Sequence, residues 1–166
     1  MDNNDLYMIY LNSSNIGLSN SGLPILATED SDFTTTIRPL NLSQSSNWVV
    51  GVVDVNYYNL DNNPSVPAGT KEYPINIYSD VGIQVRNGGG TTDLLYTTAP
   101  PINVTPKPLY FGEKNTSSII GWRPIQNKSI QKINMRFVTP TGEECMWDGT
   151  GTRGFNSITL AIMKVQ

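Results

Sequence analysis

The residue types that most often carry enzyme chemistry are sparse in this sequence. There is no histidine, so the usual general base near neutral pH and the commonest zinc ligand are both missing. Cys145 is the single cysteine, which excludes an internal disulfide and is interpreted as a buried thiol. Glu143 and Glu144 are neighbours on a predicted strand and face opposite ways, which argues against a glycosidase pair. We predict no catalytic residue and do not expect an enzyme.

Three further segments have residue types that could hold a ligand. Gly149 to Gly154 matches the G-x-G-x-x-G dinucleotide pattern, but a predicted strand follows it where that site needs a helix. Asn87 to Thr91 lacks the lysine and helix of a phosphate-binding loop. Glu29, Asp30 and Asp32 offer oxygen ligands to calcium without the full ligand pattern of an EF-hand. We therefore expect no cofactor and no metal ion.

Aromatic side chains leave one binding hypothesis open. Flat aromatic rings bind sugar faces, and the same rings also suit the core of a β-sandwich, which is the favoured interpretation. The residues concerned are Trp48, Trp122, Trp147, Tyr57 and Tyr58. A carbohydrate-binding lectin or adhesin is therefore kept as the alternative function.

Charge and hydropathy exclude other classes of partner. The sequence pI of about 4.8 is far from the basic footprint of a nucleic-acid-binding protein. No apolar run approaches the length of a membrane span, and no signal peptide is visible, so synthesis in the cytosol is expected. Residues 1–93 are net acidic and residues 94–166 net basic, which would help unlike flanks of neighbouring copies attract each other.

Hydrophobic alternation at period two predicts strands throughout, and no stretch has the spacing of an amphipathic helix. The clearest case is Ile130–Val138, followed by a type I turn at Thr139–Gly142 and a return strand at Glu143–Trp147. The other predicted strands are Leu6–Leu11, Phe33–Pro39, Trp48–Tyr57, Pro74–Tyr78, Gly82–Arg86, Ser117–Arg123 and Ser157–Val165.

Two of these strands are apolar on both sides. Trp48, Val50 and Val52 share one side of their strand, while Val49, Val53 and Val55 are assigned to the other. The last strand likewise places Ile158, Leu160 and Ile162 opposite a second apolar row. Loops or another subunit must cover what the core does not. The residues predicted for self-association are Trp48, Val50, Val52, Ala161, Met163 and Val165.

The predicted fold class is all-β, a single jelly roll: an eight-stranded antiparallel sandwich with room for one extra hairpin. One domain is expected over residues 1–166, because the sequence shows no internal repeat and no second composition regime. Residues 87–117, with three consecutive glycines and a Pro-Pro pair, are predicted to form a long elaborated loop.

The order of features resembles the single jelly-roll minor capsid, or penton, proteins of virophages and Polinton-like viruses. The segments that carry this resemblance at the start are Met8–Ser14, Asp32–Thr34, Pro39–Leu42 and Trp48–Val55, with Tyr57 soon after. Those that carry it at the end are Arg123–Ile125, Ile130–Val138, Pro140–Glu143, Trp147–Gly149, Phe155 and Ile158–Ile162. It implies five copies around each fivefold vertex of an icosahedral shell, set among double jelly-roll major capsid proteins, and no catalytic residue.

Three functional hypotheses follow from the sequence. The first is a structural capsid subunit, a homopentameric penton found in the virion and assembled in the host cell cytoplasm, or another single jelly-roll capsid subunit. The second is the lectin or adhesin, on the same fold. The third is a hydrolase with two carboxylates about 5 to 10 Å apart in a cleft.

Overall fold

The computed structural model describes residues 6–13, 32–58, 74–87, 90–98, 110–114, 122–142 and 156–165. These residues form eleven strands, and their bounds are β1 (Leu6–Asn12), β2 (Asp32–Asn41), β3 (Asn47–Tyr58), β4 (Asn76–Ser79), β5 (Val85–Asn87), β6 (Gly90–Thr92), β7 (Leu94–Thr97), β8 (Tyr110–Lys114), β9 (Arg123–Pro124), β10 (Ser129–Val138) and β11 (Ser157–Val165).

Strand β10 shows why the alternating segments become strands with one wet face. Ile133, Met135 and Phe137 are fully buried, because every second side chain of a strand points to the same face. Lys132 and Arg136, at intervening positions, are exposed. The prediction of a strand over Ile130–Val138 is confirmed, with one additional residue at its start.

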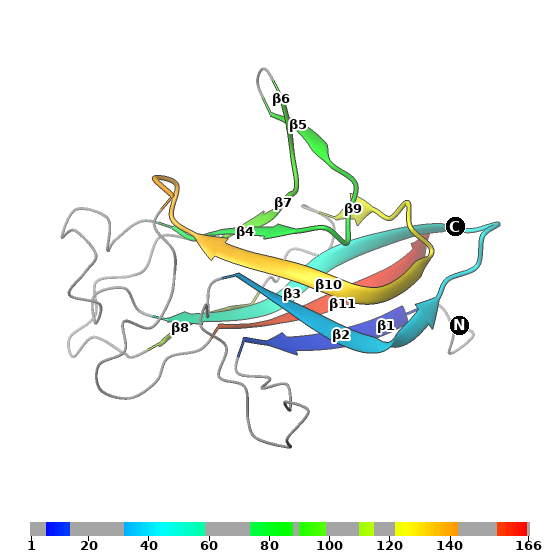
Figure 1. The fold of residues 1–166 in the computed structure, drawn as a ribbon, viewed down its shortest axis with the longest axis horizontal. Helices are drawn as coiled ribbons and strands as arrows, with labels where there is room; N and C mark the ends of the chain where they lie inside the picture. Colours follow the sequence, from blue (N-terminus) through cyan, green and yellow to red (C-terminus); the bar gives the residue numbers. More distant parts are fainter. Residues whose placement is uncertain are drawn as a thin grey trace, which may run out of the picture.

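Two four-stranded antiparallel layers pack face to face (Figure 1). The first sheet has the order β1-β11-β3-β8, and the second has the order β2-β10-β4-β7. Strands β1, β2, β3 and β4 alternate between the two sheets, as do β8, β10 and β11, so each sheet is completed by strands from distant parts of the sequence. This is the jelly-roll arrangement, and the predicted fold class is confirmed.

Smaller pieces attach to this framework. Strand β9 pairs with β3 at Val49 and Val50, on the same side of β3 that β8 uses further along. Strands β5 and β6 form a ribbon that projects from the sandwich between β4 and β7 (Figure 1). The last cross-strand pair of this ribbon is Asn87 with Gly90.

The core fills the space between the sheets. From the first sheet, Leu11, Val50, Ile158, Leu160 and Ile162 point inward. The second sheet contributes Phe33, Ile77, Leu95, Ile133, Met135 and Phe137. Phe33 and Phe137 stack with ring centroids 6.1 Å apart, an aromatic pairing that adds to the burial of their area.

A β-bulge in β3 changes which of its residues face the core, compared with the prediction. Leu160 pairs with Val52 and Thr159 pairs with Asp54, so Val53 is the extra residue of β3 opposite β11. The extra residue reverses the alternation, and Val55 therefore points into the core with Val50 and Val52 instead of outward with Val49. The other side of β3 is consequently less apolar than strict alternation predicts.

The segment 87–117, predicted as one elaborated loop, contains β6, β7 and β8. Strands β7 and β8 are edge members of the two sheets, and Leu95 on β7 is part of the core. The glycines and prolines around these short strands mark the connections between them, which is the physical reason that the prediction was wrong.

The turn after β10 matches its prediction, since the backbone N–H of Gly142 donates to the carbonyl of Thr139 at 3.0 Å. Gly142 has a φ of +95°, a conformation that favours glycine. The return strand predicted at Glu143–Trp147 lies outside the described residues. Of the predicted strand Ser117–Arg123, residues 117–121 lie outside the described residues, and Arg123 begins β9. In place of the predicted Gly82–Arg86, the structure forms β5, which starts and ends later in the sequence.

Candidate assembly surface

The outer faces of the two sheets differ in chemistry. On the second sheet, the side-chain amide of Asn134 donates to Asp32 Oδ1 at 2.9 Å and to Thr34 Oγ1 at 3.2 Å. The backbone N–H of Asn134 donates to a carboxylate oxygen of Asp80 at 2.9 Å. These polar groups already form hydrogen bonds with one another, so a protein partner that covered this face would gain little binding energy from them.

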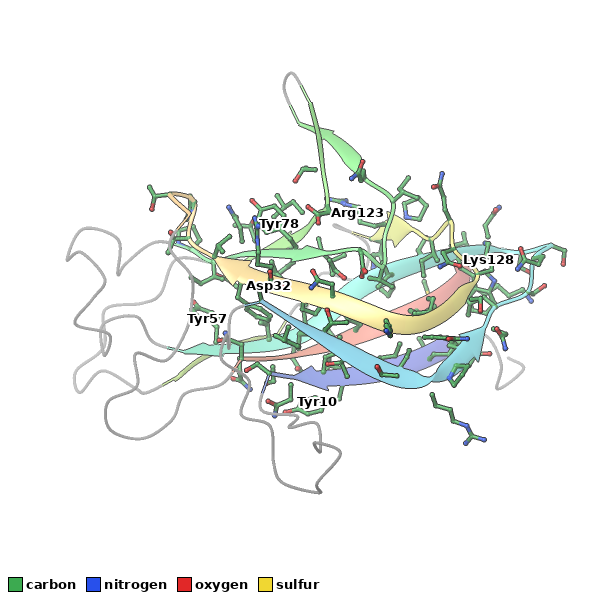
Figure 2. The ribbon with its side chains drawn as sticks, in the orientation of Figure 1. Tyr10, Asp32, Tyr57, Tyr78, Arg123 and Lys128 are labelled. Atoms are coloured by element: carbon green, nitrogen blue, oxygen red, sulfur yellow. The ribbon has the colours of Figure 1, made fainter. Side chains whose placement is uncertain are left out.

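Arg136 extends this polar face across β10 and β4. Its guanidinium carbon lies 5.0 Å above the ring centroid of Tyr78, a cation–π contact. Tyr78 lies on β4 of the second sheet, whereas Tyr10 lies on β1 of the first, and Figure 2 labels both side chains. The face that carries Tyr78 is therefore polar and internally paired, and it faces away from the surface described next.

The outer face of the first sheet is apolar where β1 meets β11. Every large hydrophobic side chain classed as exposed among the described residues lies on these two strands: Leu6 (54% exposed), Met8 (55%), Tyr10 (59%), Met163 (37%) and Val165 (41%). We call these five residues the β1 patch. Leu6 is the cross-strand partner of Met163, and Met8 that of Ala161, so the side chains form contiguous rows.

Tyr10 is held in place by its own strand. The side-chain amide of Asn12 donates to the Tyr10 hydroxyl oxygen at 3.1 Å, and both residues project from the same face of β1. This hydrogen bond satisfies the polar end of the ring and leaves its apolar faces exposed at the margin of the molecule (Figure 2).

The molecule covers the neighbouring part of the same face itself. Gly51 on β3 pairs with Ala161 on β11, and the indole of Trp122 lies directly over Gly51. Ala161 is only 4% exposed. Trp122 precedes β9, whose Pro124 carbonyl accepts the backbone N–H of Ile83 at 2.8 Å. The apolar surface of the first sheet is thus closed over β3 and open over β1.

The predicted self-association residues divide into two groups. Trp48, Val50 and Val52 lie in the core, at 6% exposure or less, and so present no surface to a neighbouring copy. This corrects their assignment, since alternation shows which residues share a side but not which side faces the core. Ala161, at 4% exposure, is likewise covered within the molecule, and only Met163 and Val165 are exposed, in the β1 patch.

Leu6, Met8 and Tyr10 are exposed residues that were not predicted for self-association. The segment Leu6–Leu11 has apolar residues at both odd and even positions, which is the same signal that singled out the other two strands. Alternation puts Leu6, Met8 and Tyr10 on one face and Tyr7, Ile9 and Leu11 on the other, and the structure shows the second group packed on the core.

Among the described residues, those considered for other chemistry form no common site. Trp48 and Tyr57 are core side chains, so neither contributes to an exposed sugar-binding platform. Asp32 accepts a hydrogen bond within the polar face, and no group of three or more potential metal ligands occurs among the described residues. Trp122 lies over Gly51 on the first sheet. Other candidates lie outside the described part of the chain: Glu29, Asp30, Glu143, Glu144, Cys145, Trp147 and Gly149–Gly154.

The described residues form no helix with the length and apolar character that crossing a membrane requires.

The architecture of this chain also occurs in a protein of known structure. No protein-family model matches the chain, and no curated protein matches it in sequence. The crystal structure of the selenomethionine-labelled mavirus penton protein superposes with a TM-score of 0.57, covering 96% of this chain and 100% of that chain at 8% sequence identity. The two proteins share a fold. The expected resemblance to a virophage penton protein is therefore confirmed for the architecture.

Proposed function

We propose that this chain is a structural subunit of an icosahedral virus capsid, the penton that forms a ring of five copies at each fivefold vertex. The observation that carries the proposal is the match to the mavirus penton protein, which covers all of that protein and 96% of this chain. In this proposal the pentamer sits among double jelly-roll major capsid proteins in the virion and is assembled in the cytoplasm of the host cell.

The outer surfaces of the sandwich support a role in assembly. Five exposed apolar side chains form the β1 patch, whereas the opposite face is polar and paired within itself. Exposed apolar patches with a polar surround mark sites of association. The proposal assigns no catalytic step, and it agrees with the likeness to a structural capsid protein rather than to an enzyme.

The mass of the assembled protein tests the proposal directly. Native mass spectrometry and multi-angle light scattering should show a species of five 18.3-kDa subunits that dissociates on dilution. A protein that stays monomeric at the highest concentration reached in both methods would overturn the proposal.

A second experiment tests the capsid role apart from the oligomer. The chain is co-expressed with a double jelly-roll major capsid protein encoded by the same genome, and the particles are imaged by cryo-electron microscopy. Density for five sandwiches at each vertex is the expected result. Particles that close with empty vertices in the presence of the folded chain would contradict the proposed position.

A further inference from the structure

Strand β1 is incompletely buried on both of its faces. Its outward residues Leu6, Met8 and Tyr10 belong to the exposed patch. Its inward residues Tyr7 and Ile9 pack against the core and yet are only partly buried. Tyr7 contacts Trp48, with ring centroids 5.8 Å apart. The hydrophobic core therefore reaches the surface at this corner of the sandwich.

No other described strand pairs with the outer edge of β1, and the strand itself lacks the usual protections against strand pairing. It is the terminal strand of the first sheet, it pairs with β11 over all seven residues without a bulge, and it contains no charged residue and no proline. Natural proteins guard such edges with charges, prolines, bulges or short strands, because unpaired backbone groups attract other chains.

The other edge strands do carry these protections. Strand β2 includes Asp32, Arg38 and Pro39 and has a bulge in its pairing with β10. Strand β7 has four residues, and β8 ends with Glu113 and Lys114. The unprotected edge of β1 is thus specific to the corner that also carries the exposed apolar side chains.

The size of the patch suits one part of a stable protein interface. At roughly 200 Å² for a large side chain, the exposed fractions of the five patch residues amount to about 500 Å² of surface. A standard interface buries about 800 Å² on each partner, with an apolar centre and a polar rim. The patch is therefore large enough to be the centre of such an interface.

We infer that the β1 patch, together with the open edge of β1, is the surface that a neighbouring copy of this chain covers in the ring. This inference rests on the proposed function. The patch contains no charge, so it offers nothing to an ion or a nucleic acid. It is also the only cluster of exposed large hydrophobic residues on the described surface, which makes it the main source of association energy there.

The symmetry of a ring adds one constraint. A patch that meets its own copy forms a twofold contact, and five subunits cannot be paired by twofold contacts. In a pentamer the β1 patch of one subunit therefore meets a different surface of the next. The hydrogen bond from Asn12 to Tyr10 lowers the cost of this contact, because the ring is ordered before association.

Charge substitutions in the patch test the inference. Met8→Glu and Met163→Glu place a carboxylate on each of the two strands, and Met8→Ala is a milder third variant. Thr36→Glu is the matched control, because Thr36 is an exposed position on the outer face of the second sheet, opposite Lys132. Circular dichroism and thermal unfolding verify that every variant is folded before its mass is measured.

We expect the two glutamate variants to need at least about ten-fold more protein to assemble, which corresponds to a loss of about 1.4 kcal/mol at the contact. The control should assemble as the parent does. Pentamers of unchanged affinity in all three patch variants would overturn this inference and leave the proposed function standing. A parent protein that is monomeric would overturn both the inference and the proposed function. If the parent instead forms a twofold dimer that the patch variants do not form, the patch is an interface but the proposed ring contact is wrong.

Discussion

The indole ring of Trp122 occupies the space in which a side chain of residue 51 would begin. Its Cδ2 and Cε3 atoms lie 2.7 and 2.8 Å from the position that a Cβ would take on Gly51. Real Cβ atoms do not approach other atoms this closely, so the absence of a side chain on β3 is what lets the tryptophan lie flat on the sheet. Trp122 in turn covers the outer apolar surface of the first sheet over β3, next to the exposed β1 patch.

Substitution of Gly51 is therefore expected to destabilise the fold. Gly51→Ala should lower the free energy of unfolding by about 1–3 kcal/mol, because the methyl group displaces the indole. Gly90→Ala is the control, since no atom lies within 4 Å of its Cβ position. In the Trp122→Ala background Gly51→Ala should cost much less, and equal costs in both backgrounds, measured by denaturant titration, would disprove this packing.

Because of the bulge at Val53, Val53 and Val55 lie on opposite faces of β3 and should contribute differently to stability. Val55→Thr should lower the free energy of unfolding by about 2 kcal/mol, because its hydroxyl enters a core position that is 1% exposed. Val53→Thr should change it by about 0.5 kcal/mol or less, since Val53 is half-buried on the other face. Urea titration of both variants decides the point, and the reverse order would mean that β3 has no bulge.

Ser13 and Asn156 join the end of β1 to the start of β11. The backbone N–H of Asn156 donates to Ser13 Oγ at 2.8 Å, and the N–H of Ser13 donates to the Asn156 carbonyl at 2.9 Å. Ser13→Ala should cost about 1–3 kcal/mol, because it leaves a buried N–H without its acceptor. Ser45→Ala, on an exposed turn, is the control, and amide hydrogen exchange at residue 156 should accelerate in Ser13→Ala alone.

The hydrogen bonds of Asn134 should stabilise the polar face. Asn134→Ala removes the bonds to Asp32 and Thr34 and is expected to lower the free energy of unfolding by about 1–2 kcal/mol. Asn127→Ala serves as the comparison. Asn127 lies in an exposed loop and accepts a single hydrogen bond, from the backbone N–H of Ser129, so its substitution should lower the free energy of unfolding by less. Thermal unfolding that gives the two variants the same midpoint would contradict this role.

The sequence predicts the strands and the jelly roll well wherever the alternation is long. Strands β1, β10 and β11 lie within one or two residues of their predicted bounds, because seven to ten residues of alternation leave no helical interpretation. Strands β7 and β8 escaped prediction, since four or five residues between glycines and prolines resemble a loop. The bulge at Val53 has no local signal, because a valine suits a strand on either side of it.

The assembly surface is only partly predictable for a related reason. Alternation identifies Met163 and Val165 as a row separate from Ile158, Leu160 and Ile162, and the structure confirms the separation. It cannot tell which row of β3 faces the core, because that depends on how the two sheets pack. Trp48, Val50 and Val52 were therefore placed on the surface, and the open position of β1 became visible only from the strand order.

The strand order has a consequence for how the molecule is made. Strand β11 lies between β1 and β3, and β10 lies between β2 and β4, so the middle of each sheet is supplied late in the sequence. Leu6 must wait for Met163 to be synthesised before the two can pair, a separation that makes folding slow. Until translation reaches β10 and β11, the early strands of a nascent chain lack the central partners of both sheets.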